Sequence, residues 1–96
     1  MSNQLVDRDS YREQMEARVA QWAGEIEALQ ARAGETPDRG TAAELETLEY
    51  HFQRVHGTLD QMEVVKDIAW ADWREELEQN AADLQAAIDR LKARLA

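Results

Sequence analysis

Two histidines supply the only imidazoles of the sequence, the side chains best suited to proton transfer and metal binding near neutral pH. His51 and His56 stand about 140° apart on an α-helix, so they cannot bind one ion within a single chain. His56, Asp60 and Glu63 share one helical face and are candidate ligands of a carboxylate–imidazole metal site in a helical bundle. Neither Glu-x-x-His nor His-Glu-x-x-His occurs. A solvated helix surface is therefore the favoured interpretation, and a metal site is the alternative.

The residue types present do not favour a catalytic site. Adjacent acids such as Glu75 and Glu76 can act as a catalytic acid and base only in a cleft that gives the two carboxyl groups different pKa values. A helix surface offers no such cleft. The chain has no Cys, which removes thiolate nucleophiles, disulfides and Cys-based metal sites. It also lacks a glycine-rich phosphate loop. We therefore expect no enzyme activity and no cofactor.

The size and charge of the chain narrow the choice of partners. Its 96 residues allow one small domain, and 20 acidic against 11 basic side chains give a net charge of −9. This charge disfavours nucleic acid and anionic membranes as partners. The sequence shows neither a signal peptide nor a membrane-spanning segment, so we expect a cytoplasmic protein. A peripheral membrane protein that inserts Trp70 and Trp73 is the alternative.

The composition and the end signals predict an all-α protein. Ser10 with Glu13, and Thr41 with Glu44, form two capping boxes that mark helix starts. Gly34, Pro37 and Gly40 fall in one short segment that breaks helices. We therefore expect a flexible N-terminus over residues 1–9, a helix over 10–33, a turn over 34–40 and a long helix over 41–95. Gly57 marks the alternative of a kink or break in that helix.

Apolar residues recur at alternating spacings of three and four, the pattern of a coiled-coil seam. The second helix carries one seam up to Met62 and another from Trp70 onward, which is offset by one residue and so rotated by about 100°. The first helix covers the second only up to about Lys66. The two helices are expected to form an antiparallel hairpin.

The apolar residues beyond Lys66 would then lack a partner within the chain. Leaving so many large apolar side chains in water is unfavourable, so we expect a second copy to cover them in an antiparallel homodimer or higher oligomer, as a helical bundle. A break at Gly57 would instead permit a three-helix bundle within one chain. The expected oligomer interface comprises Ile68, Trp70, Trp73, Leu77, Leu84, Ile88, Leu91 and Leu95.

Several segments resemble a family of small bacterial coiled-coil domain-containing, or stress-response, proteins. The resemblance rests on Tyr11 spaced eleven residues from Trp22, on Ile26 and Leu29, and on the segment Ala-Trp-Ala-Asp-Trp-Arg-Glu-Glu-Leu over residues 69–77. It implies a helical assembly with a role under stress and transfers no site residue. The expected function is a non-catalytic structural or interaction protein that binds itself or an unidentified protein partner. The metal-binding bundle and the peripheral membrane protein are its alternatives.

Overall fold

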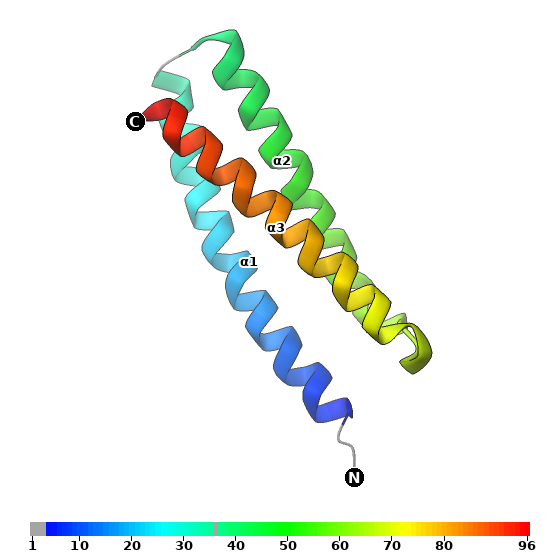
Figure 1. The fold of residues 1–96 in the computed structure, drawn as a ribbon. Helices are drawn as coiled ribbons and strands as arrows, with labels where there is room; N and C mark the ends of the chain where they lie inside the picture. The colour runs from blue at the N-terminus through cyan, green and yellow to red at the C-terminus, as the bar shows by residue number, and fades with distance from the viewer. Residues whose placement is uncertain (1–3, 36) are drawn as a thin grey trace.

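The computed structural model describes residues 4–35 and 37–96 as an elongated bundle whose extents are 54 × 19 × 18 Å. In this part of the chain three α-helices and two short 3-10 helices follow one another, with no strand (Figure 1). The elements are α1 (Gln4–Glu35), α2 (Arg39–Asp60), η1 (Gln61–Val64), η2 (Asp67–Ala69) and α3 (Trp70–Leu95). The predicted all-α fold and helical bundle are confirmed.

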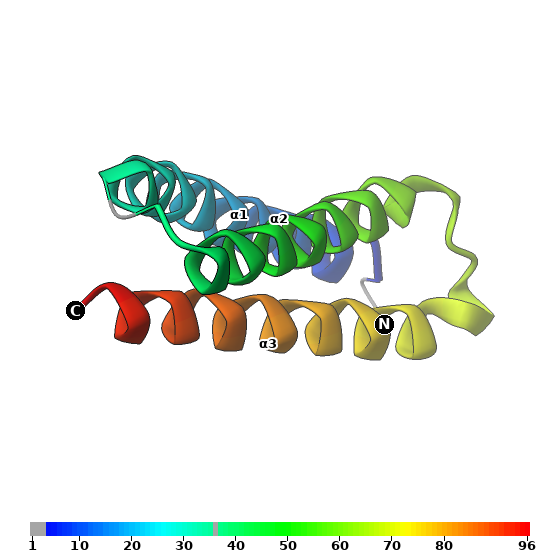
Figure 2. The ribbon, with the colours of Figure 1, turned by 90° about the horizontal axis from the view of Figure 1, so that it is seen from above.

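The prediction of one long helix over 41–95 is wrong. The chain turns at η1 and η2, and α3 runs back beside α2 (Figure 2). Val65 and Lys66 adopt extended backbone conformations, with ψ angles of 123° and 156°. Val64 and Val65 are β-branched and therefore poor helix formers. Gly57 lies within α2 and does not break it.

The turn lets α3 bury its apolar seam within the chain. Trp73 and four seam residues of α3, three leucines and one isoleucine, are buried in one core with residues of α1 and α2: Leu77, Leu84, Ile88 and Leu91 are 0 % exposed. Trp70 and Leu95 are partly buried against the same core. Of the eight expected interface residues, only Ile68 is largely exposed, at 93 %. The expectation that these residues lack a partner within the chain was therefore wrong, because the long helix that would have exposed them does not form.

The helix ends also differ from the predicted ones. Residues 4–9 belong to α1 instead of a flexible terminus, because tertiary contacts support this extra turn: the Arg8 guanidinium donates a hydrogen bond to the Val65 carbonyl at 2.8 Å. Helix α2 begins earlier than Thr41, since Asp38 is its N-cap and accepts a hydrogen bond from the Thr41 backbone N–H. Within the predicted turn, Thr36 lies outside the described residues.

Candidate protein-binding surfaces

An aromatic cluster joins the start of α1 to the start of α3. Tyr11 makes edge-to-face contacts with Trp70 and Trp73, at centroid distances of 5.8 and 6.3 Å, and the two indoles stack at 5.1 Å. The Arg8 guanidinium lies 4.4 Å above the Trp70 ring, while the buried Trp73 indole donates a hydrogen bond to the Thr58 carbonyl. Both tryptophans are thus engaged within the bundle. A membrane-anchoring role for Trp73 would require its indole, which is 8 % exposed, to leave the core.

Glu78 is the polar centre of the contact between α1 and α3. Tyr11 donates a 2.6 Å hydrogen bond to its carboxylate, and Arg18 forms a salt bridge with it at 3.2 Å. Desolvation raises the pKa of Glu78, but the hydrogen bonds from Tyr11 and Arg18, together with the positive charges of Arg18 and Arg74, outweigh this effect and leave the pKa below its usual value. Burial, followed by the hydrogen bond to Glu78, raises the pKa of Tyr11 well above the ordinary range. These shifts arise from groups that hold two helices together.

The three candidate metal ligands are not brought together. His56 Nδ1 lies 3.4 Å from an Asp60 carboxylate oxygen, but the Glu63 carboxylate pairs with Arg12 at 3.2 Å. Among the described residues, no group of three or more His, Asp or Glu side chains is arranged to hold a metal ion. His56 and Asp60 form an exposed i,i+4 pair of the kind that adds little to stability.

Asp38 closes the end of the bundle where the C-terminus meets the first turn. Its carboxylate accepts hydrogen bonds from the backbone N–H and the hydroxyl of Thr41, and it pairs with Arg94 at 3.1 Å. The hydrogen bonds from Thr41 have the largest effect on the pKa of Asp38, and together with Arg94 they lower it to about 2. The Asp38 carboxylate therefore caps α2 and holds the end of α3 by its salt bridge to Arg94.

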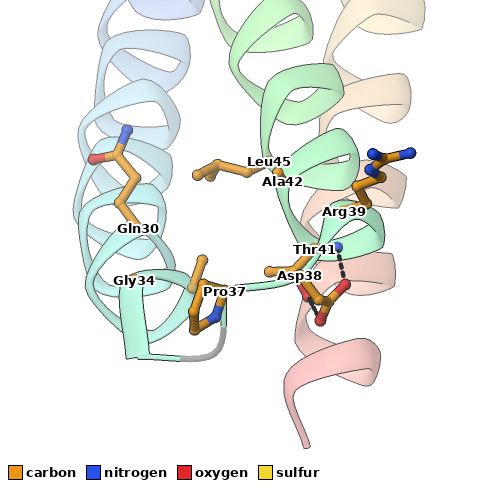
Figure 3. Close-up of a pocket in the computed structure, with 9 residues that line it drawn as sticks. Gln30, Gly34, Pro37, Asp38, Arg39, Thr41, Ala42 and Leu45 are labelled. Carbon is orange, nitrogen blue, oxygen red and sulfur yellow. Dashed lines mark hydrogen bonds between the residues drawn. The ribbon is translucent and has the colours of Figure 1, made fainter.

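A groove follows the seam between α1 and α2. Its middle section has a volume of about 590 Å³, and its end section, near the first turn, about 470 Å³; Gln30 lines both. Leu45 reaches from α2 toward α1, and Pro37 lies at the turn that closes the end section (Figure 3). The middle section is lined by Ala23, Ile26, Glu27, Gln30, Glu49, Phe52 and Gln53.

The groove has an apolar floor and an acidic rim. Phe52 and Leu45 are half-buried and pack against the core, while Ala23 is exposed and too small to fill the space above them. Glu27 on α1 and Glu49 on α2 stand on the two sides of the middle section. Gln30 donates a 2.7 Å hydrogen bond to Glu49 and so bridges the two helices.

Two exposed aliphatic residues lie at the tip of the bundle. Val64 and Ile68, in η1 and η2, are 78 % and 93 % exposed. Single exposed apolar side chains are common on protein surfaces and do not by themselves mark a contact site. Ile68, expected at the oligomer interface with the apolar residues of α3, lies apart from them because the chain changes direction at Val65.

Comparisons with protein-family models, curated proteins and solved structures find no match to this chain. No described helix is both long and apolar enough to cross a membrane. The functional interpretation therefore depends on the geometry. The groove is not predicted from the apolar spacing, although one signal is present in the sequence: the small residues Ala23 and Ala42 occur beside the apolar seams of α1 and α2, where larger side chains would have closed the space.

Proposed function

We propose that this protein is a non-catalytic interaction module that presents the α1–α2 groove to a protein partner. The observation that carries the proposal is the groove itself, which combines partly exposed Phe52 and Leu45 with polar rims. Interfaces of this kind need an apolar centre surrounded by polar groups. Self-association is not required, because α1 and α2 already cover the seam of α3.

The ionisable groups of the bundle support the same proposal. The groups with shifted pKa values serve structural contacts: Tyr11 and Glu78 join α1 to α3, and Asp38 caps α2. Among the described residues, every buried side-chain nitrogen or oxygen has a hydrogen-bond partner. Polar groups that are satisfied within the fold stabilise it and do not require a bound substrate to complete them. A role under stress, as the family resemblance implies, stays a prediction.

Site-specific photo-crosslinking in the cells that make the protein tests this function. A benzophenone amino acid is placed at the exposed Gln53 on the rim of the groove, where it leaves the space above Ala23 open, and, as a matched control, at the exposed Gln79 on α3. We expect a discrete protein adduct from position 53 and none from position 79. If neither position gives an adduct, or if both give the same diffuse products, the proposed function is wrong.

A further inference from the structure

We infer that the groove between α1 and α2 binds a basic amphipathic helix of another protein. This inference rests on the proposed function and specifies the partner. The middle and end sections extend along α1 from Ala23 to Gly34, which is roughly 16 Å of helix at about 1.5 Å per residue. About three turns of a partner helix fit this length. A helix-in-groove complex uses apolar anchors at i, i+3 or i+4, and i+7, which span about two turns.

The floor of the groove supplies contacts for such anchors. Ile26 is buried at its base, and Phe52 and Leu45 are half-buried along the side of α2. Ala23 and Ala42 leave space above them. An apolar side chain inserted from outside would therefore contact side chains that already belong to the core, and it would remove their remaining exposed surface from water.

The charge around the groove selects a basic partner. Glu27 and Glu49 line the middle section, and no Lys or Arg among the described residues lines it. Glu27 and Glu49 are left to pair with lysines or arginines that flank the apolar stripe of a partner helix.

The same charge argues against other occupants. Two copies of a chain with a net charge of −9 repel each other, so a second copy is a poor ligand for an acidic groove. Arg39 and Asp38 lie only at the closed end of the groove, where Asp38 is already paired with Arg94. The acidic middle section therefore determines which helix binds.

Binding is tested with a synthetic peptide of about 18 residues, with leucines at helical i, i+3, i+4 and i+7 spacing and lysines elsewhere. The ¹⁵N-labelled full chain is titrated with this peptide, and backbone amide shifts are followed by NMR. We expect the largest shifts at groove residues such as Ala23, Glu27 and Phe52. A peptide of the same composition, scrambled so that the leucines no longer share a face, should bind at least tenfold more weakly.

Two matched pairs of variants separate the groove from general attraction between opposite charges. Ala23→Arg fills the groove and should weaken binding at least tenfold, whereas Ala82→Arg, in the separate pocket between α1 and α3, should leave the affinity unchanged. The double variant Glu27→Gln/Glu49→Gln should weaken binding severalfold at low salt. Glu75→Gln/Glu76→Gln, which removes the same charge from an exposed face of α3, should have a much smaller effect.

Three results would overturn this inference. They are equal binding of the ordered and scrambled peptides, shifts spread over all acidic surfaces, and equal effects of the two variants in either pair. If a crosslinked adduct nevertheless forms at position 53, the proposed function stands and only the basic-helix partner is rejected. If position 53 gives no adduct and the peptide does not bind, both are rejected.

Discussion

Tyr11 on α1 donates a 2.6 Å hydrogen bond to Glu78 on α3, across 67 positions of sequence. The carboxylate that accepts this bond also pairs with Arg18, one of the cations of α1. Together with the Trp22–Gln85 hydrogen bond and the Lys92–Glu25 salt bridge, this cluster joins α1 to α3 and helps to set the rotation of α1 about its axis. The same rotation leaves the opposite side of α1 facing α2 across the groove.

The Tyr11→Phe variant should lower the free energy of unfolding by about 1–2 kcal/mol, because a partly buried hydrogen bond to a charged group is lost. Tyr50→Phe is the matched control. Its hydroxyl accepts a bond from Arg54 on an exposed surface, so the change should stay within about 0.5 kcal/mol. Urea unfolding at neutral pH measures both, and equal effects would show that the Tyr11–Glu78 bond contributes nothing.

The same bond predicts how stability depends on alkaline pH. Folding raises the pKa of Tyr11 above its ordinary value of 10.0, so the folded state retains a proton that the unfolded state loses. The stability that Tyr11 contributes is therefore present below pH 10.0 and is lost as the pH rises further. Unfolding of the parent chain should become more favourable with pH in this range, and the Tyr11→Phe variant should lack part of that slope.

Asp38 makes the opposite prediction in acid. Hydrogen bonds from Thr41 and Arg94 lower its pKa from 3.8 to about 2, so its contribution is present above pH 3.8 and is lost as the pH falls toward 2. The difference in stability between the parent chain and Asp38→Asn should shrink over this interval. Thermal unfolding at a series of pH values measures the difference, and a constant value would contradict the role of the charged carboxylate.

Gly57 lies inside α2, and a Cβ placed there meets no atom within 4 Å. Gly57→Ala should therefore raise the free energy of unfolding by about 0.5–1 kcal/mol, since glycine weakens a helix interior. Gly24→Ala, at an equally open position in α1, should give a similar gain. A loss of stability at position 57 alone would indicate that the chain bends there.

Leu84 and Ile68 test where the apolar residues of the C-terminal half are buried. Leu84 is fully buried within the chain, so Leu84→Ala should cost about 2–5 kcal/mol. Ile68 is 93 % exposed, so Ile68→Ala should change stability by no more than about 0.5 kcal/mol. Light scattering should give the same mass for parent and Leu84→Ala, and a lower mass for the variant would support the oligomer interface instead.

Much of the fold follows from the spacing of apolar residues. The seam residues of the first helix and of α3 are those that the core buries, since their periodicity depends only on helix geometry. The reversal at residues 61–69 was not predicted, because neither proline nor glycine marks it. Its signals were weaker: the one-residue slip of the seam after Met62 and the β-branched pair Val64 and Val65. The chain reverses at residues 61–69 because the seam of α3 is then buried against α1 and α2.

The polar contacts were less predictable than the core. Ser10 and Thr41 have the sequence features of helix starts, yet Ser10 lies within α1 and Asp38 caps α2 in place of Thr41. Local capping preferences are worth about 1 kcal/mol, and contacts between distant segments, such as Arg8 with Val65, outweigh them. The groove depends on how far apart two helices pack, which sequence periodicity does not specify.

The distance between the two ends of the α2–α3 hairpin tests the fold-back of α3 most directly. Because the chain has no Cys, spin labels can be attached uniquely to Ala43→Cys and Ala93→Cys, two exposed positions. Double electron–electron resonance, with the labelled chain diluted in unlabelled protein, should give an intrachain distance on the order of 20–30 Å, since packed helix axes lie about 8–10 Å apart. One continuous helix with a rise of about 1.5 Å per residue requires a distance of roughly 75 Å between the two labels. That result would contradict the three-helix bundle and would place the apolar seam of α3 in an interface between chains.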